Sequence, residues 1–216
     1  MITSPSGQPS IEVFGILIME PVVTLTDLMV TAVSLYAFIK LKKLNRPGRA
    51  QQYLRYYFLI MAAATAFGGI TGHAFQYALG IEWKLPGWLI SMLAISALER
   101  GIISFLSPII PKKLSSFLEI TNVAELVLFT AISFITLNFF FVQVHSAYGL
   151  AVVVFPLCFY AFWKTGNNGA RIICLSILFT ILAAVFYTAK ISISPWFNHL
   201  DISHTVMAIG IYFFYR

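Results

Sequence analysis

Long uninterrupted runs of apolar residues dominate this 216-residue sequence. A helix needs about 20 mostly apolar residues to cross the hydrocarbon core of a bilayer. Lipid offers no hydrogen-bond partners, so such a segment has to pair its own backbone amides. Because the runs do not alternate with polar residues, we predict helices and an all-α integral membrane bundle. The expected seven transmembrane helices lie near residues 17–39, 54–79, 87–110, 117–140, 145–163, 171–190 and 195–215.

Composition excludes several other classes of protein. The chain is 59% hydrophobic and 10% charged, whereas soluble domains carry about a quarter charged residues. A soluble globular enzyme, a disordered tail and a nucleic-acid module are therefore excluded, and we expect no nucleic-acid partner. Cys158 and Cys174 both lie inside apolar runs, which argues against a disulfide framework. The connections are short, so we predict one membrane domain over residues 1–216.

Basic residues indicate the orientation, because cytoplasmic connections are enriched in Lys and Arg. The first, third and fifth connections and the C-terminus hold Lys40, Lys42, Lys43, Arg46, Arg49, Arg55, Lys112, Lys113, Lys164, Arg171 and Arg216. The opposite side holds only Lys84 and Lys190. We therefore predict an outside N-terminus, a cytoplasmic C-terminus and a multi-pass protein of a bacterial-type inner membrane.

Histidines and one aspartate at expected membrane depth form a candidate zinc site. Ionisable groups are costly in a membrane and usually face the bundle interior. Asp201 and His204 are three residues apart and share a helix face, while His199 lies on a neighbouring face. His73 follows small residues that permit close helix approach. Zinc needs three protein ligands and an open position for water, so we predict a site built from His73, Asp201 and His204, with His199 as an alternative ligand.

Other polar residues admit simpler interpretations. Glu20, Thr24 and Asp27 form one stripe on the first helix, in which Asp27 lies nearer mid-depth. Asp201 is also a candidate helix N-cap. A helix over residues 201–216 would be about 24 Å long, shorter than a bilayer core of about 30 Å. His145, in a polar connection, is expected to have an interfacial role.

Two further groups of polar residues lie on the third and fourth predicted helices. We expect Glu99 and Arg100 to form an internal ion pair that braces the third helix. Glu119, Asn122 and Glu125 are spaced as a polar stripe on the fourth helix. That stripe is either an interfacial face or the lining of an inner vestibule.

The seven-span layout and its histidines resemble the CREST superfamily of membrane hydrolases, which includes alkaline ceramidases and the adiponectin and progestin receptors. His73 and His204 match two of the three zinc-binding histidines of that superfamily. The histidine expected four residues before His204 is Leu200, and the serine expected four residues before His73 is Gly69. The aspartate expected early in the third helix is absent.

The resemblance implies a zinc-dependent hydrolase, similar to an amidohydrolase, that acts on a lipid amide or related acyl bond. Membrane lipid would be the partner and a lipid-like molecule the substrate. Glu82, Glu99 or Asp27 would move the proton. The sequence leaves enzymatic activity open, because the altered motif is also compatible with a transporter, a channel or a receptor-like sensor that uses the buried carboxylates and histidines.

Overall fold

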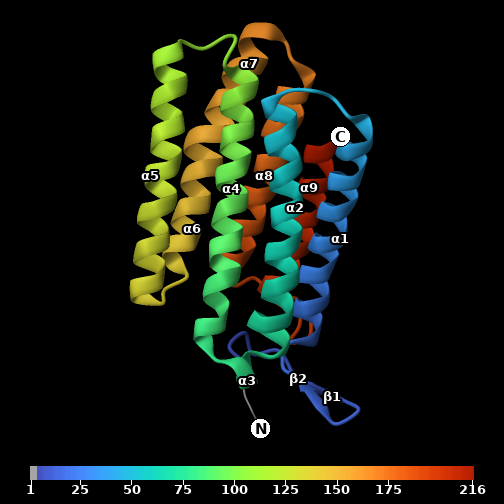
Figure 1. Cartoon of the computed structure of the whole chain (residues 1–216). Coiled ribbons are helices and arrows are strands. Elements are labelled where there is room, and N and C mark those ends of the chain that lie inside the picture. The colour runs from blue at the N-terminus through green and yellow to red at the C-terminus, as the bar shows by residue number, and fades with distance from the viewer. Residues whose placement is uncertain (1–3) are drawn as a thin grey trace.

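The computed structural model describes residues 4–216 as an all-α bundle with a small N-terminal β-hairpin (Figure 1). Its long helices are α1 (Pro21–Leu44), α2 (Arg49–Phe67), α4 (Leu85–Leu106), α5 (Lys112–Thr136), α8 (Asn168–Thr188) and α9 (His199–Tyr215). Short helices α3 (Gln76–Leu79) and η2 (Ile81–Lys84) lead into α4. Six helical segments are long and apolar enough to cross a membrane, so the chain is a multi-pass membrane protein.

Two of these segments contain π-helical turns. The segment Arg49–Ala74 consists of α2 and the π-helix η1 (Gly68–Ala74). The segment Phe140–Thr165 consists of α6 (Phe140–Ala147), the π-helix η3 (Tyr148–Val154) and α7 (Phe155–Thr165). Single π-helical turns inside α-helices are rare and are frequent at functional sites.

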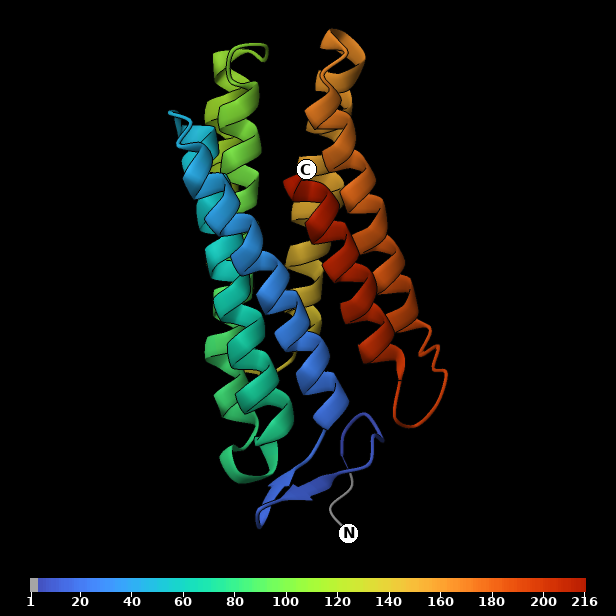
Figure 2. The ribbon, with the colours of Figure 1, turned by 90° about the vertical axis from the view of Figure 1, so that its right-hand side faces the viewer.

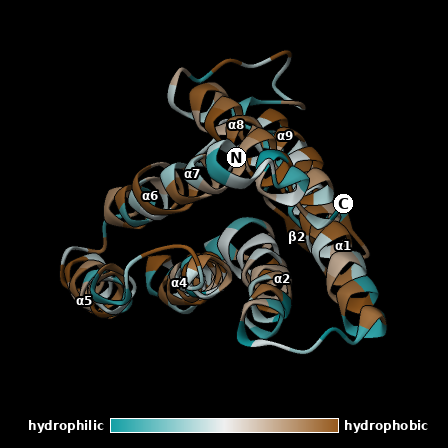
Figure 3. Ribbon diagram, turned by 90° about the horizontal axis from the view of Figure 1, so that it is seen from above, coloured by the Kyte–Doolittle hydropathy of each residue, from teal (hydrophilic) through white to brown (hydrophobic). Residues whose placement is uncertain are grey.

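The helices form two layers that are joined at both edges. α5, α4, α2 and α1 lie side by side in one layer, and α6–α7, α8 and α9 lie in the other (Figure 3). Contacts between α1 and α9 join the layers at one edge, where the two helices run next to each other (Figure 2). Contacts between α5 and α6 join them at the other edge. Apolar side chains such as Val30, Leu98, Ile102 and Ile211 fill the space between the layers.

The last helix starts later than the predicted span 195–215. α9 begins at His199 and has 17 residues, so it is shorter than the six membrane-spanning candidates. Asn198 is its N-cap, and Asp201 completes a capping box with Asn198. The helix therefore begins at the point where the Asn198 side chain can accept a hydrogen bond from a free backbone amide of the first turn. A seventh crossing by α9 stays a prediction.

The N-terminal segment also differs from the predicted first span, 17–39. Strands β1 (Ile11–Val13) and β2 (Ile16–Ile18) pair antiparallel with Ile11 opposite Ile18. Phe14 and Gly15 have φ values of 52° and 77°, as in the tight turns that join two antiparallel strands. The first helix begins only at Pro21, whose missing amide hydrogen suits a helix start.

The arrangement brings the basic connections to one end of the bundle. The α1–α2 and α7–α8 connections lie at the end that holds the C-terminus (Figure 1). The β-hairpin lies at the opposite end, together with the α3 turn (Figure 1). The first and fifth predicted connections therefore lie at the same end of the bundle, as expected for connections on one side of the membrane. Which end faces the cytoplasm stays a prediction. Cys158 and Cys174 are buried free thiols, as expected.

Candidate metal centres

The first candidate centre lies at the end of the bundle that carries the β-hairpin. We call it the Asp27 cluster and define it as Glu20, Asp27, His73 and His204. Glu20 immediately precedes α1, and Asp27 lies two turns into that helix. His73 belongs to the π-helix η1, and His204 lies in the first turns of α9. The fold therefore brings His73 and His204 together, as predicted, but adds Asp27 between them.

Both imidazoles turn one nitrogen toward the Asp27 carboxylate. His204 Nε2 lies 3.5 Å from Asp27 Oδ1, and His73 Nε2 lies 3.8 Å from Asp27 Oδ2. The opposite nitrogen of each ring has its own partner. His73 Nδ1 lies 2.5 Å from Glu20 Oε2, and His204 Nδ1 lies 3.1 Å from the Thr26 hydroxyl.

These partners fix the tautomers. Glu20 is a carboxylate and accepts, so His73 carries its hydrogen on Nδ1. When the Thr26 hydroxyl donates to the Val23 carbonyl at 3.0 Å, its oxygen is the acceptor for a hydrogen on His204 Nδ1, and we assign that tautomer. In the neutral rings both Nε2 atoms are then lone-pair acceptors that face a carboxylate. A proton would pair one Nε2 with one carboxylate oxygen, whereas a metal ion can accept electron pairs from both imidazoles and the carboxylate.

Glu20 is held in its charged form although it is almost completely buried. Burial by itself raises the pKa of Glu20, but the hydrogen bond and charge of His73 and the hydrogen bond from Ser6 outweigh it, and the pKa falls to about 2. The amide of Ser6 donates to Glu20 Oε1 at 2.9 Å. Such a carboxylate behind a histidine is a common device for orienting metal-binding imidazoles.

Small residues let η1 approach α1 closely, as the sequence predicted. A Cβ atom on Gly69 would lie 2.9 Å from Asp27 Cβ and 3.4 Å from the Thr24 carbonyl oxygen. The Thr24 hydroxyl donates to the Gly69 carbonyl at 3.2 Å. Gly69 thus leaves the space that the Asp27 carboxylate needs beside His73.

Asp201, a predicted zinc ligand, is engaged in the cap of α9. Its Oδ2 atom accepts from the Asn198 amide at 2.8 Å and from Gln8 Nε2 at 3.1 Å. Thr26 Oγ1 lies 3.4 Å from the other oxygen. Gln8 in turn accepts from the first free amides of α1, at Val22 and Val23. Asp201 therefore ties the N-terminal segment to α1 and α9, and Asp27 occupies the position facing both histidines.

Two other predicted residues lie outside the Asp27 cluster. His199 is half-buried, its amide donates to Ser192 Oγ at 3.1 Å, and its ring packs against Tyr187 with 5.9 Å between centroids. Glu82 is exposed in the η2 turn. Neither side chain forms a hydrogen bond with a member of the cluster within the described residues 4–216.

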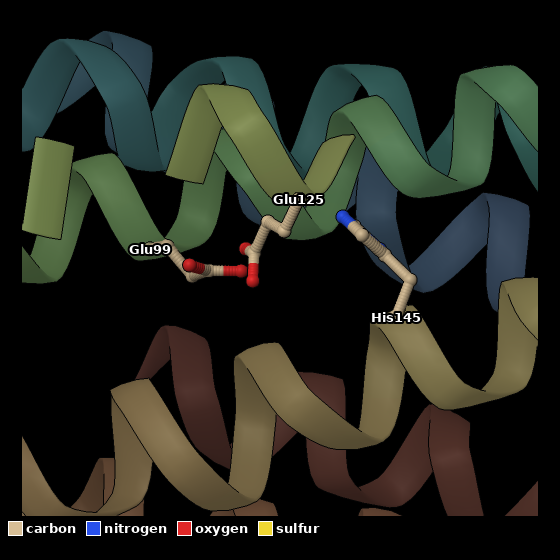
Figure 4. Close-up of side chains that lie close together, drawn as sticks. All are labelled: Glu99, Glu125 and His145. Carbon is tan, nitrogen blue, oxygen red and sulfur yellow. The ribbon is translucent and has the colours of Figure 1, made fainter. Parts of the chain in front are cut away.

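The second candidate centre is a buried group of Glu99 from α4, Glu125 from α5 and His145 from α6, which we call the Glu/Glu/His cluster. Figure 4 shows the three side chains turned toward one another. One ligand atom from each lies within 4.8 Å of the other two. Across residues 4–216 this is the only group of three or more metal-ligating side chains with that spacing. The Asp27 cluster is more open, with 6.3 Å between the two imidazole centroids.

The Glu/Glu/His cluster corrects two expectations. Glu99 and Arg100 do not form the predicted ion pair, because the Asn122 amide lies between them: its Nδ2 donates to Glu99 Oε2 at 3.2 Å and its oxygen accepts from Arg100 Nε at 2.9 Å. His145 is completely buried and lies within α6, not in a polar connection as expected. The predicted stripe on α5 divides into buried Asn122 and Glu125 and exposed Glu119.

This second cluster was not predicted from the sequence, although Asn138 indicates an earlier helix start that would have suggested it. The predicted fifth span began at His145, whereas α6 begins at Phe140. The Asn138 side chain accepts from the Phe140 amide at 2.9 Å, which is typical of residues that start helices. An earlier helix start places His145 more than a turn inside the segment, where it meets Glu99 and Glu125.

No curated protein and no solved structure matches the chain. One protein family does match, over residues 22–216, which is nearly the whole chain. That range includes Asp27, His73 and His204 as well as the Glu/Glu/His cluster. The chain belongs to this family, which is described as a family of unknown function (DUF6962).

Proposed function

We propose that this protein is a metal-dependent membrane hydrolase whose active site is the Asp27 cluster and whose substrate is a lipid amide or a related acyl bond. The observation that carries the proposal is the shared orientation of the two histidines. His73 and His204 belong to helices that are far apart in the sequence, yet each directs Nε2 to an oxygen of the same carboxylate.

The residues present suit a zinc ion held by His73, His204 and Asp27. Two ligands at about 2.0 Å from a tetrahedral zinc are separated by about 3.3 Å. The separations between the histidine nitrogens and the Asp27 oxygens, 3.5 and 3.8 Å, are close to that value. They involve different oxygens of Asp27, and the three ligand atoms do not all lie within 4.8 Å of one another, so binding one ion requires the side chains to rotate inward. Glu20 and Thr26 hold the far nitrogens, so both imidazoles are oriented in the tautomer that a metal requires.

Partial exposure distinguishes the Asp27 cluster from the Glu/Glu/His cluster as the place for hydrolysis. The side chains of His73 and His204 are 19% and 15% exposed, so both are accessible from outside the bundle. Glu99 and His145 are 1% and 0% exposed. Zinc, when bound, lowers the pKa of a bound water toward neutrality and polarises the scissile carbonyl. Of the three carboxylates predicted to move protons, only Asp27 lies at the two histidines, and in this proposal it acts as a metal ligand.

The resemblance to the CREST superfamily supports this proposal through the position of the histidines, one late in the second helix and one early in the last. In this chain the third ligand comes from the first helix, as Asp27. The full proposal is a seven-span protein with its active site in the outer half of a bacterial-type inner membrane. There it would draw a lipid-like substrate directly from the bilayer.

A carrier, channel or receptor-like sensor is the competing function. A proton or ion pathway across the bundle requires connected polar groups. Within residues 4–216 no hydrogen bond joins the Asp27 cluster to the Glu/Glu/His cluster, although Glu99 reaches Asn122 and His204 reaches Thr26. The two clusters are therefore separate centres, which favours local chemistry over a relay.

The test uses the full chain, purified in detergent without chelators, with its zinc content and its hydrolysis of a panel of lipid amides and esters measured together. His73→Ala, His204→Ala and Asp27→Asn should each lose one zinc per chain and at least about 100-fold in rate, because each removes a ligand. The matched control is His199→Ala, which removes a half-buried histidine outside the cluster. Unchanged zinc in all three variants, or ion flux in liposomes without hydrolysis of any lipid in the panel, would reject the proposal.

A further inference from the structure

We propose that the Glu/Glu/His cluster binds a second, structural divalent cation that fastens helix α5 to the rest of the bundle. The proposal does not depend on the hydrolase function. It concerns Glu99, Glu125 and His145, which share no hydrogen bond with the Asp27 cluster within residues 4–216.

Charge gives the first argument. Two carboxylates lie close together in an apolar bundle, where an uncompensated buried charge costs several kcal/mol. No lysine or arginine forms an ion pair with either carboxylate in the described residues. Arg100, the nearest cation along the chain, donates to the Asn122 oxygen and the Glu119 carbonyl instead. One divalent cation would balance both charges.

Unsatisfied polar atoms give the second argument. Within residues 4–216, Glu99 Oε1, both oxygens of Glu125 and both ring nitrogens of His145 are buried without a hydrogen-bond partner. Buried polar groups are nearly always paired. A proton shared between the two carboxylates would satisfy the oxygens but would leave the lone pair of His145 unused. A cation accepts electron pairs from all three side chains.

The spacing of the ligand atoms also suits an ion. Ligands at about 2.0–2.2 Å from one metal are at most about 4.4 Å apart. The three ligand atoms already lie within 4.8 Å of one another, so small side-chain rotations close the site. Two carboxylates and one imidazole favour a first-row divalent ion such as Mn²⁺, Fe²⁺ or Zn²⁺ over Ca²⁺, which prefers oxygen ligands alone.

The surrounding backbone is shaped around the carboxylate of Glu99. A Cβ atom on Gly149 would lie 2.6 Å from Ile95 Cγ2 and closer still to Glu99 Oε1. Gly149 belongs to the π-helix η3, which begins three residues after His145. Asn122 fixes the other oxygen of Glu99, and Ser96 Oγ donates to the Asn122 oxygen at 3.0 Å. Glu99 is thus oriented from two sides, as supported metal ligands are.

The position of α5 indicates what the ion does. This helix packs mainly against α4 and α6, and most of its residues are not buried inside the bundle. The three ligands come from these three helices, one from each. Because all three side chains are buried, with Glu125 the most exposed at 8%, the site has little open approach for a substrate. A cation there would act as a cross-link that stabilises a weakly packed helix.

The experiment uses the His73→Ala/His204→Ala double variant of the full chain, in which the Asp27 cluster can no longer contribute. This variant is loaded with Mn²⁺ or Zn²⁺ and washed, and its metal content is measured. We expect one ion per chain in this background and none after the further isosteric change Glu125→Gln. The control is Glu119→Gln, an exposed glutamate on the same helix, which should keep the ion. Absence of metal from the double variant, or retention after Glu125→Gln, would overturn the proposal.

Two measurements keep the test decisive if Glu125→Gln does not fold. In the Mn²⁺-loaded double variant with ¹⁵N-labelled histidine, the pulsed electron paramagnetic resonance spectrum should show coupling to a single imidazole. Hydrogen exchange over residues 112–136 should slow by at least about tenfold when the ion is added, because opening α5 then requires its release. Coupling to no imidazole, or exchange unaffected by the ion, would contradict a site at His145 that holds α5.

Discussion

Gly69 and Asp27 are packed so closely that a Cβ atom on the glycine would lie 2.9 Å from the Cβ atom of the aspartate. This contact joins the π-helix η1 to α1 and sets the distance between His73 and the Asp27 carboxylate. The absence of a side chain at Gly69 therefore leaves room for the Asp27 carboxylate to face both histidines.

Gly69→Ala should damage the Asp27 cluster without unfolding the bundle. The added methyl pushes Asp27 away from His73, and overpacking of this kind costs about 1–3 kcal/mol. We expect a lower melting temperature and loss of zinc from the Asp27 cluster. The matched control is Gly68→Ala, the preceding residue in the same π-helix, where a Cβ atom meets nothing within 4 Å. Equal zinc content in the two variants would show that the contact does not position Asp27.

The Glu20–His73 pair should make the metal-free protein sensitive to acid. The pKa of Glu20 is about 2 in the folded protein, compared with the ordinary glutamate value of 4.5 that applies to the unfolded chain. A lowered pKa stabilises the fold above the unfolded value, and that contribution is lost as the pH falls from 4.5 toward 2. It amounts to about 3–4 kcal/mol at most.

The measurement is the melting temperature of chelator-treated protein between pH 5 and pH 2.5, compared with that of Glu20→Gln. Wild type should be more stable at pH 5, and the difference should shrink as the pH falls. A constant difference over this range would mean that ionised Glu20 does not stabilise the fold.

Much of the fold followed from hydropathy alone, because membrane-spanning helices require long apolar runs. The proximity of His73 to His204 also followed, since both were expected at the same end of their helices. What the sequence could not show is side-chain competition. Asp201 was an equally good ligand by spacing, but its carboxylate is engaged by Asn198 and Gln8, and Gln8 lies in an N-terminal segment without helical periodicity.

The Glu/Glu/His cluster was not predicted for a different reason: its residues were expected at different depths in the membrane. Glu125 was expected toward the cytoplasmic side and His145 at the outer end, so the two were not considered together. α6 starts five residues earlier than expected, which places His145 inside the helical segment, and the π-helix η3 that follows brings Gly149 against Glu99. Hydropathy carries no information on either feature.

Asp201→Ala should destabilise the protein but leave zinc binding intact. The change removes a helix cap, which contributes about 0.5–2 kcal/mol, and leaves the Asn198 amide without its acceptor, while Gln8 Nε2 keeps only the Trp196 carbonyl. We expect a clearly lower melting temperature with unchanged zinc per folded chain. Loss of zinc with an unchanged melting temperature would instead identify Asp201 as a ligand.

Gly149→Ala should act on the second centre in the same way that Gly69→Ala acts on the first. Its methyl group would displace the Glu99 carboxylate and Ile95. We expect reduced Mn²⁺ binding in the His73→Ala/His204→Ala background and a lower melting temperature, with Gly68→Ala again as the control. Full Mn²⁺ binding in Gly149→Ala would mean that the orientation of Glu99 is not needed for the ion.

The most direct measurement is an anomalous difference map at the zinc absorption edge, recorded from crystals of the full chain grown without chelators. We expect a peak bounded by His73 Nε2, His204 Nε2 and the Asp27 carboxylate, which disappears in crystals of Asp27→Asn. A map without density there, from protein shown to contain zinc, would contradict an active site built on Asp27.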